Sequence, residues 1–388
     1  MTKQLRIAIV GFGMAGATTA AALARRGYEA DVFEQAKAVR EVGAGLGLWV
    51  NAARLLKRLG LGSDLERVGC AARESAIFTP TGDLIQRIQA TSSDGTSGYT
   101  IHRAELLDAI AQRVSRERLH LDMRCTGVHE RDDAVRLDFA DGSSAEFDVV
   151  LGADGLRSVV HDTVTEPSPP RFANLVAHRG LAPNTPDLAL DNGRVWTDRK
   201  KYVIIFPVSG GRRINFAGFM PVEGMPEESW FTRGDKAEIE AEFAGWHPYL
   251  LRVIEVLPET FRWGLYVRDP LPRIVSRRTA LVGDAAHPMT PHLGMGAVQA
   301  IEDAFALAVF LEGASPAQVP ERLQLYQRLR LPRVHMVQEL TRRNAQFTHA
   351  AFPLKPGEER PSTLAPTQAL IDYDAEREAE KMLESNSG

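Results

Sequence analysis

Cysteine is scarce in this sequence, which has only Cys70 and Cys125 among 388 residues. Two isolated cysteines are too few for a disulfide framework and lack the spacing of a zinc site. Cytosolic proteins keep their thiols reduced, whereas small secreted domains depend on disulfides. The sequence therefore favours a protein of the reducing cytoplasm, and we expect no bound metal.

Long hydrophobic runs are also missing. The longest apolar runs fall far short of the roughly 18 residues that a transmembrane helix needs. Residues 7–24 are small and apolar enough to imitate a signal peptide. However, three glycines would interrupt its helix, and Arg25-Arg26 stands where a cleavage site would be. We therefore expect neither export nor stable association with a membrane.

No charge of one sign dominates the sequence. Lys and Arg number 46 and Asp and Glu number 50, which leaves a net charge of −4 without a strongly one-signed block. This balance argues against nucleic acid and against an anionic membrane surface as partners. A chain of this length is long for one hydrophobic core, so we expect two interleaved domains, in a monomer or a homodimer.

Glycine, by contrast, gathers at three junctions between a strand and a helix. At the first, the β-rich run Leu5–Val10 leads into Gly11-Phe12-Gly13-Met14-Ala15-Gly16 and an Ala-rich helix, and a second strand ends at Glu34. Gly11 allows a tight turn, Gly13 lets the backbone approach a pyrophosphate, and Gly16 permits close helix–strand packing. A carboxylate about 20 residues further on accepts ribose hydroxyls. These pieces in this order predict a dinucleotide site.

The junction around which the chain is organised lies later. The apolar strand Thr279–Val282 leads into a turn at Gly283-Asp284, a Pro- and Gly-rich loop, and a helix that opens near Ala297. The first turn of a helix leaves backbone N–H groups without partners, and such groups favour an electron-rich or phosphorylated ligand. Asp284 adds an acceptor carboxylate at the end of the strand. We interpret this loop as the seat of a large planar cofactor.

The third junction is the run 152–158, GADGLRS, which follows an apolar strand. Asp154 either contacts a ligand there or caps the helix that it precedes. Before this junction, Arg103 stands in the first turn of a predicted helix, where a cation opposes the helix dipole. An anionic partner such as pyrophosphate explains this placement, and a surface ion pair with Glu105 or Asp108 is the alternative.

The remaining pattern divides the chain into two parts. Short alternating strands surround a turn at Pro80–Gly82, and the Pro-rich segment 166–170 marks a boundary. The turn Asp141-Gly142 predicts a hairpin between Val135–Phe139 and Phe147–Leu151. After the boundary we expect a strand meander and two helices, at Leu175–Leu181, Arg194–Thr197, Tyr202–Val208, Arg213–Phe219, Ala237–Phe243 and Tyr249–Val256. Long helices at 300–313 and 320–349 precede a charged segment that we expect to be a mobile tail.

The three glycine-rich junctions together resemble the motifs of the single-component FAD-dependent aromatic hydroxylases. The match keeps its order and spacing over residues 5–350. Within that family the chain is most similar to the salicylate, 6-hydroxynicotinate and urate hydroxylases. The runs Val176-Ala177-His178-Arg179-Gly180 and 287–292, HPMTPH, point to its hydroxynicotinate-like members.

This resemblance implies an α/β fold with a Rossmann-like FAD-binding domain of the p-hydroxybenzoate hydroxylase type. An α+β substrate domain, built on a mostly antiparallel sheet, is interleaved with it, and helices follow at the C-terminal end. The expected FAD-binding domain comprises residues 1–75, 98–165 and 270–350. The substrate domain comprises 76–97 and 166–269, and 351–388 form the C-terminal tail.

The resemblance also implies roles for particular residues. The ADP half of FAD would lie at Gly11, Gly13, Ala15, Gly16 and Glu34, with Arg103 at the pyrophosphate and the backbone of Cys125 by the adenine. Asp154 would serve both an FAD phosphate and the reduced nicotinamide, and Asp284 would accept from the ribityl chain. The flavin ring would meet Gly45 and the backbone of Gly294, Met295, Gly296, Ala297 and Val298. The substrate pocket would be formed by Gly47, Trp196, Phe206, Phe219, Pro291 and His292.

The implied activity is a hydroxylation. NADH or NADPH reduces FAD, O2 adds to give a flavin C4a-hydroperoxide, and an electron-rich aromatic ring takes up its distal oxygen, so the cofactor carries the hard chemistry. A phenolate reacts faster than a phenol, which calls for a base or a proton relay beside the substrate hydroxyl. His292 is our candidate because imidazole accepts a proton near neutral pH. Alternatively His292 only hydrogen-bonds the loop backbone, and we expect His287 to be structural.

One departure from the family pattern leaves the substrate open. The hydroxynicotinate hydroxylases carry a histidine where Gly47 follows Leu46 here, and a pocket side chain is also replaced within Ile204–Phe206. We therefore expect a small phenolic or hydroxy-heteroaromatic substrate, and an aromatic acid in particular. The individual compound stays open. Other interpretations are a quinone or polyene epoxidase, a flavin halogenase, an NAD dehydrogenase without flavin, and a non-catalytic flavin-binding sensor. The first needs an amphipathic anchor and the second a Trp-x-Trp-x-Ile-Pro segment, which this sequence lacks.

Overall fold

A five-stranded parallel sheet forms the centre of the molecule. The computed structural model describes residues 5–39, 44–198, 200–222, 232–348 and 367–386. In it, β1 (Ile7–Val10) lies between β12 (Val149–Gly152) and β2 (Asp31–Phe33), with β18 (Thr279–Leu281) and β8 (Leu119–His120) at the edges. Every neighbouring pair in this sheet is parallel. Ligands of open parallel sheets bind outside the carboxyl ends of the strands, so this order already locates a site.

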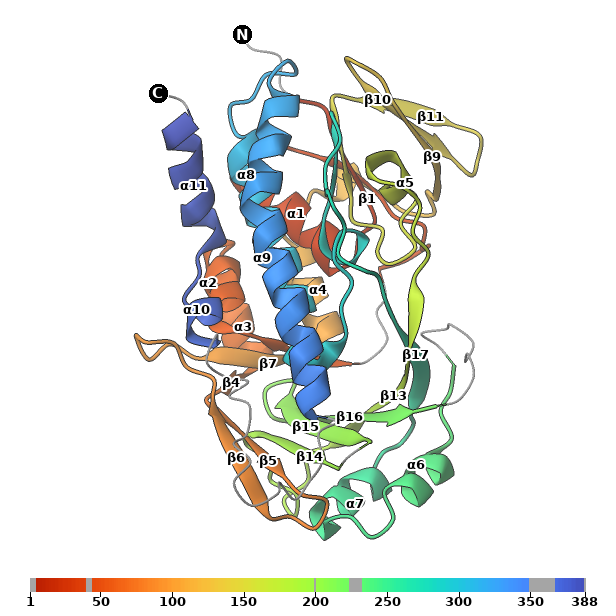
Figure 1. The fold of residues 1–388 in the computed structure, drawn as a ribbon, viewed down its shortest axis with the longest axis vertical. Helices are drawn as coiled ribbons and strands as arrows, with labels where there is room; N and C mark the ends of the chain where they lie inside the picture. Colours follow the sequence, from red (N-terminus) through yellow and green to blue (C-terminus); the bar gives the residue numbers. More distant parts are fainter. Residues whose placement is uncertain (1–4, 40–43, 199, 223–231, 349–366, 387–388) are drawn as a thin grey trace.

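Two helices pack closely against each other beside this sheet. Helix α1 (Met14–Arg25) is built mainly from Ala, Thr and Gly, and its small side chains let it pack closely on α8 (Gly296–Leu311). Nearly every residue of α8 is buried, because α9 (Val319–Thr348) covers its other side (Figure 1). Three polar residues of α8, Gln299, Glu302 and Asp303, are buried with its apolar residues.

The intervening segments add smaller units around the parallel sheet. A three-stranded sheet pairs β7 with β3 and β4, and a second pairs β10 with β9 and β11. The elements of this part are β3 (Gly45–Leu48), α2 (Val50–Arg58), α3 (Gly62–Val68), β4 (Gly69–Ala72), β7 (Gly98–His102), α4 (Arg103–Ala111), η1 (Arg116–Arg118), β9 (Cys125–Glu130), β10 (Val135–Phe139), β11 (Ser144–Phe147) and α5 (His161–Val164). The segment between β18 and α8 contains two short 3-10 helices, η2 (Gly283–Ala285) and η3 (Pro291–Leu293).

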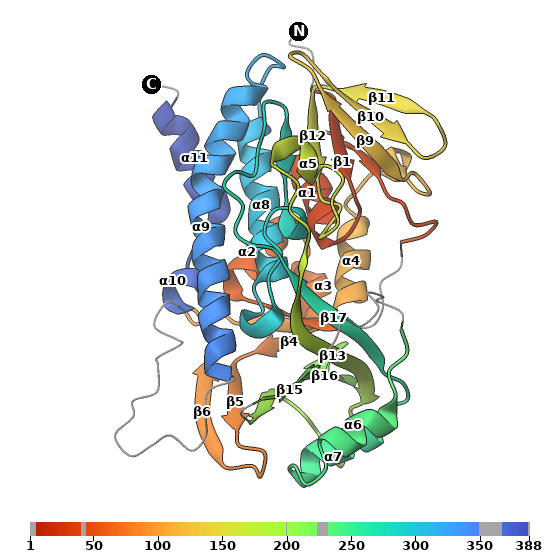
Figure 2. The ribbon, with the colours of Figure 1, turned by 45° about the vertical axis from the view of Figure 1, so that its right-hand side comes forward.

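A seven-stranded sheet forms the other half of the molecule. Its order is β17-β13-β16-β15-β14-β5-β6, and all its pairs are antiparallel except β14 with β5. Its strands are β5 (Glu74–Phe78), β6 (Leu84–Gln89), β13 (Arg171–Pro183), β14 (Gly193–Thr197), β15 (Tyr202–Val208), β16 (Arg213–Pro221) and β17 (Phe261–Val267). Helices α6 (Lys236–Glu242) and α7 (Pro248–Glu255) cover one face, and the opposite face turns toward the parallel-sheet half (Figure 2).

The expected fold class is confirmed, and two local expectations are wrong. The hairpin at Asp141-Gly142 forms, but its second strand is β11, which shares only Phe147 with the expected Phe147–Leu151, and β12 instead joins the parallel sheet beside β1. The charged C-terminal segment is not a mobile tail over 367–386. There α10 (Thr367–Ile371) and α11 (Ala375–Asn386) form, and α11 packs on α8 and α9. Glu376 holds α11 in place through ion pairs with Arg25, Arg26 and Arg58.

The two larger sheets divide the chain in the order that was expected. β5 and β6 leave the parallel-sheet half early, and β13 to β17 leave it again after the Pro-rich segment. The exact domain boundaries remain a prediction. Within the part of the chain that the structure describes, no helix is both long enough and apolar enough to span a membrane.

Candidate active site

The first glycine motif is required by close backbone contacts. Gly11 has a φ of +98°, and a Cβ on it would lie 2.5 Å from the carbonyl oxygen of Ala153, at the end of β12. A Cβ on Gly16 would lie 1.9 Å from the carbonyl oxygen of Gly11. Only glycine fits at either position. The absence of a side chain there lets β1, β12 and α1 come together at one turn.

That turn ends at the open N-terminus of α1. Gly13 is the N-cap, no side chain caps the helix, and the position of a Cβ on Gly13 has no atom within 4 Å. The first-turn N–H groups, including that of Ala15, therefore face space that suits a phosphate. Glu34, at the end of β2, accepts from the backbone N–H groups of Phe12 and Ala36, each at 2.8 Å. Its carboxylate is thereby fixed beside the same turn.

Asp154 makes the backbone contacts before α5 that its sequence position allowed. Its Oδ2 accepts from the backbone N–H groups of Val159 and Val160, at 2.7 and 3.3 Å, just before α5. Its Oδ1 is buried and has no hydrogen-bond partner among the described residues. Burial raises the pKa of Asp154, and burial also raises the pKa of the nearby Cys125 thiol to about 11. One carboxylate oxygen thus shapes the loop, and contact of the other with a ligand remains a prediction.

The segment between β18 and α8 forms the second half of the site. Asp284 lies in η2 with its side chain exposed. Gly294 has a φ of +63°, and Met295, the N-cap of α8, provides no side-chain cap. No side chain caps the first backbone N–H groups of α8, at Gly296, Ala297 and Val298. These groups are therefore suited to donate to the polar edge of a planar ring.

A buried ionic cluster holds this loop from behind. Asp303 accepts from the backbone N–H of Gly283 at 3.0 Å and from Arg330 at 2.8 Å, and its Oδ2 lies 2.6 Å from Nε2 of His287. Burial alone would raise the pKa of Asp303, but the charges of His287 and Arg330 lower it to about 2. His287 is fully buried in this cluster, which agrees with the structural role expected for it.

Three further contacts fix the part of the loop that carries His292. The indole N–H of Trp49 donates to the carbonyl oxygen of Leu293 at 3.2 Å. The side-chain amide of Asn344, on α9, donates to the carbonyl oxygen of His292 at 2.5 Å. Nδ1 of His292 lies 2.8 Å from the hydroxyl of Thr290. The imidazole is therefore held on its backbone side and at one ring nitrogen.

His292 faces the seven-stranded sheet across the boundary between the two halves. Its ring lies 5.3 Å from the ring of Tyr202, centroid to centroid. Tyr202 in turn stacks on Phe219 at 4.4 Å, with an angle of 16° between the rings. Both aromatic residues belong to the face of the sheet that α6 and α7 leave uncovered. Burial raises the pKa of Tyr202, so its hydroxyl stays protonated at neutral pH.

Strand β3 brings two glycines to the same face. A Cβ on Gly45 would lie 2.5 Å from the ring of Phe206 and 2.8 Å from Asn215, whose side chain also accepts from the Gly45 N–H at 2.7 Å. Gly47 is different, because no atom lies within 4 Å of the position of its Cβ. Gly45 is thus required by packing, whereas Gly47 borders open space. Pro291, Phe206 and Phe219 remain predicted pocket residues.

Trp196 does not belong to this group, and its placement in the pocket was wrong. It pairs with Val203 in β15, one position out of step with Tyr202, and its ring packs on Phe78 and Tyr249 under α7. Because alternate residues of a strand point to opposite faces, Trp196 lies on the covered face of the sheet.

Arg179 and Trp263 were not predicted, although both lie on the uncovered face. The Arg179 guanidinium lies 4.1 Å from the centre of the Trp263 ring. A charged residue within the apolar strand segment 175–182 was the available signal in the sequence. Arg103, at the start of α4, is close enough for its charge to lower the pKa of Arg179. Two cations therefore share this side of the molecule.

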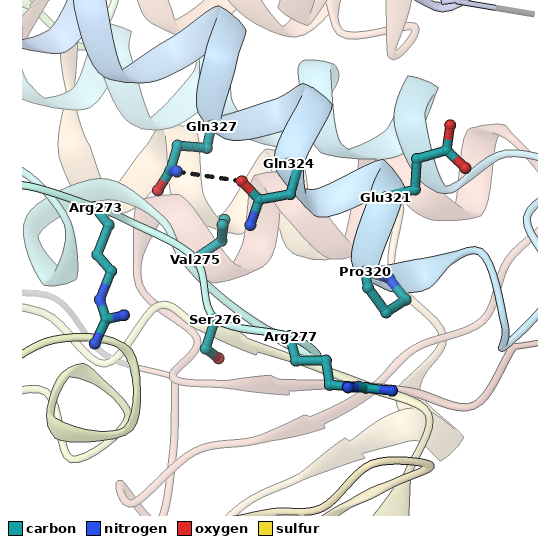
Figure 3. A pocket seen from close by; sticks show the side chains of 8 residues that line it. All are labelled: Arg273, Val275, Ser276, Arg277, Pro320, Glu321, Gln324 and Gln327. Carbon is teal, nitrogen blue, oxygen red and sulfur yellow. Dashed lines mark hydrogen bonds between the residues drawn. The ribbon is translucent and has the colours of Figure 1, made fainter.

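Two surface hollows accompany this arrangement. One of about 550 Å³ lies between residues 273–277 and the first turns of α9, and it shares no residue with the site (Figure 3). The other, a groove of about 760 Å³, is lined by Gly180, Leu181 and Phe261 and also by Arg212 and Arg213. This groove adjoins Arg179, because Gly180 follows it in β13 and Phe261 pairs with it in β17.

Comparison with known proteins now adds to this geometry. The family model of the FAD binding domain matches residues 4–341. The 3-amino-4-hydroxybenzoate 2-monooxygenase of Streptomyces cremeus is 39% identical over 361 residues, which cover 89% of this chain and 88% of that protein. The 6-hydroxynicotinate 3-monooxygenase of Bordetella bronchiseptica is 34% identical over 363 residues, which cover 89% and 92%. The chain belongs to the FAD-dependent aromatic hydroxylases.

A solved structure of the same fold agrees with this membership. Klebsiella pneumoniae HpxO complexed with FAD and uric acid matches with a TM-score of 0.80 at 29% identity, over 98% of this chain and 96% of that chain. As an FAD-dependent aromatic hydroxylase, the protein is a monooxygenase with FAD as cofactor and NADH or NADPH as co-substrate. The open helix N-termini, the unpartnered Oδ1 of Asp154 and the exposed Asp284 fit that cofactor. An epoxidase, a halogenase, a dehydrogenase without flavin and a sensor are not favoured.

Proposed function

We propose that this hydroxylase acts on a small phenolic or hydroxy-heteroaromatic acid. The observation that carries the proposal is the contact of His292, on the loop before α8, with Tyr202 on the uncovered face of the second sheet. A ring bound beside this contact meets a cofactor loop on one side and an aromatic wall on the other. Small-molecule sites combine apolar walls with a few placed polar groups in this way.

The cofactor would lie along the two glycine-rich junctions. Gly11, Gly13, Ala15, Gly16 and Glu34 would hold its ADP half, Arg103 its pyrophosphate, and the backbone of Cys125 its adenine. Asp154 would serve a phosphate and the nicotinamide of NAD(P)H, and Asp284 would accept from the ribityl hydroxyls. Gly45 and the run Gly294–Val298 would meet the flavin ring. When bound, FAD would take up electrons from NAD(P)H and would then activate O2.

His292 is the base in this proposal. A neutral imidazole at that point takes the proton of the substrate hydroxyl, directly or through a water, and makes the ring more electron-rich. If Nδ1 carries the proton and donates it to Thr290 Oγ1, the tautomer leaves Nε2 as the accepting nitrogen. The contact between Asn344 and the His292 carbonyl supports the orientation of the ring from the opposite side.

The pocket walls would exclude water from the reacting ring. Phe206, Phe219, Pro291 and Tyr202 offer apolar surface, and a dry site protects reactive intermediates from side reactions. Gly47 leaves space where the hydroxynicotinate hydroxylases carry a histidine. This space favours a ring with an additional substituent.

The choice of test compounds follows from the relatives. One is named for 3-amino-4-hydroxybenzoate and another for 6-hydroxynicotinate, and both names describe hydroxylated aromatic acids. We propose that this protein works in the cytoplasm, as a monomer or homodimer, with a preference between NADH and NADPH that the same assay determines.

Substrate-stimulated NAD(P)H consumption tests the proposal. The FAD-loaded protein would be incubated with 3-amino-4-hydroxybenzoate, 6-hydroxynicotinate, salicylate and their relatives without a ring hydroxyl, with oxygen uptake and product mass recorded. We expect at least one phenolic acid to stimulate consumption and to gain one oxygen atom, while the compounds without a hydroxyl gain none. Consumption that no member stimulates, or stimulation without an oxygenated product throughout the panel, would overturn the proposal.

A further inference from the structure

Arg179 is a half-buried cation that has no anionic partner among the described residues. It lies in β13, paired with Ala217 of β16 and Phe261 of β17, on the uncovered face of the seven-stranded sheet. Stacking on Trp263 is its side-chain contact, and its Nε is buried without a hydrogen-bond partner among the described residues. No described carboxylate lies within ion-pair distance of it. The stacking orients the guanidinium without neutralising it.

This arrangement is costly to the folded protein. Burial and, to a smaller extent, the charge of Arg103 lower the pKa of Arg179 to about 9, and Tyr202 opposes the shift. An unpaired charge out of water is destabilising unless something compensates it. Arg330, which is fully buried, shows how such a charge can be compensated, since it pairs with both Glu302 and Asp303. An anionic ligand would compensate the charge of Arg179 in the same way.

The surroundings of Arg179 also favour an anion. Arg179 is half-buried and is not sealed within the core. The groove that adjoins it is lined by Arg212 and Arg213, with a single acidic residue, Glu259. Tyr202, which contacts His292, is close enough to act on the charge of Arg179. Tyr202 thus neighbours both the cation and the proposed base.

We propose that Arg179 binds the carboxylate of the aromatic substrate and thereby makes this enzyme selective for aromatic acids over neutral phenols. This inference rests on the proposed function, because it assigns a residue to the acid group of that substrate. The planar guanidinium matches a carboxylate in a two-pronged hydrogen bond, which also fixes the direction of the ring. The acid is then held at Arg179 while the ring hydroxyl is presented to His292.

The competing explanation is that Arg179 only supports the Trp263 ring by stacking. The two explanations predict different affinities for a neutral analogue of the substrate. If Arg179 binds the carboxylate, its loss weakens binding of the acid and spares the carboxamide, which has the same shape without the charge. If Arg179 is a packing residue, both compounds lose affinity together.

The test measures dissociation constants on the FAD-loaded enzyme from the change in flavin absorbance, without turnover. The probes are 3-amino-4-hydroxybenzoate and 3-amino-4-hydroxybenzamide. Arg179→Met should weaken the acid roughly 10- to 100-fold, as expected for a charge-assisted hydrogen bond, and the amide by less than about threefold. Arg179→Lys, which keeps the charge and loses the fork, should fall between. The matched control is Arg194→Met, which removes an arginine stacked 4.3 Å from Tyr249 and should leave the acid-to-amide ratio unchanged.

Each outcome decides the question. Equal losses for acid and amide, or no loss for the acid, would overturn the assignment. If Arg179→Met does not retain FAD, the ratio of acid to amide dissociation constants in the wild type and in Arg179→Lys decides the question. A wild type that binds the acid no better than the amide would also overturn the assignment. A wild type that binds neither probe and that no acid in the panel stimulates would instead reject the proposed function. A wild type that hydroxylates acids while Arg179→Met binds them normally would reject this inference alone.

Discussion

The ring of His292 lies 5.3 Å from the ring of Tyr202, and this contact joins the two halves of the molecule. His292 belongs to η3, which leads into α8 of the FAD-binding half. Tyr202 begins β15 of the seven-stranded sheet and is 5% exposed. Different parts of the chain therefore provide the residues that hold the cofactor, shape the pocket and act on the substrate. Single substitutions should affect cofactor binding, substrate binding and catalysis separately.

The purified protein should carry non-covalent FAD, and Asp284 and Arg103 should affect its retention. Asp284→Ala removes an exposed acceptor at the end of β18, and Arg103→Ala removes a cation at the start of α4. Each charge-assisted hydrogen bond contributes about 1.5–3 kcal/mol, so each variant should bind FAD roughly 10- to 100-fold more weakly. Flavin fluorescence after dilution measures this affinity. Helix content by circular dichroism should stay that of the wild type.

Asp269→Ala serves as the control for these variants. Asp269 is exposed and pairs with Arg171, on a strand of the other half. Its loss should leave FAD affinity unchanged. Wild-type affinity in both Asp284→Ala and Arg103→Ala would mean that the cofactor lies elsewhere.

Two glycines of β3 should respond in opposite ways to a larger side chain. The space around the Cβ position of Gly47 is open, so Gly47→Val should fold, retain FAD and obstruct the pocket. We expect KM for the best acid of the panel to rise at least about tenfold, the effect of losing about 1.4 kcal/mol of binding. Gly45→Val would force a Cβ to within 2.5 Å of Phe206, so its melting temperature should fall instead. Equal thermal losses in both variants would contradict this distinction.

The sequence predicted the glycine junctions well because their requirement is local. A backbone turn like that at Gly11, with its φ of +98°, depends on a few neighbouring residues. The hydrophobic pattern likewise predicted β13 to β16 from alternation alone. β9 and β17 were missed, since β17 (Phe261–Val267) contains a glycine and two charge-bearing or polar interruptions that weaken its pattern.

Which face of a strand lies in the pocket could not be predicted in the same way. Trp196 and Phe206 are both large apolar residues in predicted strands, and only the pairing of Trp196 with Val203 shows that it lies under α7. The docking of α11 depends on ion pairs that join Glu376 to arginines 318 to 351 residues away. Such long-range pairs leave no periodic signal in the sequence.

Asp303 should stabilise the protein, with a defined dependence on pH. Its folded-state pKa of about 2 lies below the value near 3.9 that is usual for an unfolded chain. Its contribution is therefore complete above about pH 4 and is lost as the pH falls toward 2. At neutral pH, Asp303→Asn should lower the free energy of unfolding by roughly 3 kcal/mol, the lower end for a broken buried pair, because Arg330 keeps Glu302.

Chemical denaturation of the FAD-free protein at pH 7 and pH 3 measures this effect. The difference between wild type and Asp303→Asn should shrink at the lower pH. The matched control is Glu339→Gln on the exposed side of α9, where Glu339 pairs with Arg342 and Arg343. This exposed carboxylate should contribute nothing measurable at pH 7. A difference at pH 7 no larger than that of the control would show that the buried cluster does not stabilise the loop.

The last prediction concerns the chemical role of His292. The loop contacts of His292 are made by its carbonyl and by Nδ1, so an asparagine there should leave the backbone in place and FAD bound. General-base catalysis contributes about 10²- to 10⁴-fold, and hydroxylation by His292→Asn should fall by that factor near neutral pH. Reduced FAD still reacts with O2 in the variant, so NADH is spent on hydrogen peroxide in place of product. The loss should diminish at high pH, where the substrate hydroxyl ionises without help.

The measurement is the ratio of product to NADH for His292→Asn from pH 6 to pH 9, with the best acid of the panel. We expect a low ratio at pH 6 that rises toward the wild-type value at pH 9. His129→Asn, at an exposed histidine that pairs with Asp138 on β10, should keep the wild-type ratio throughout. A ratio near wild type at pH 6 would make His292 a loop residue. The base would then have to be sought on the uncovered face of the seven-stranded sheet, at a residue other than Tyr202, whose hydroxyl stays protonated.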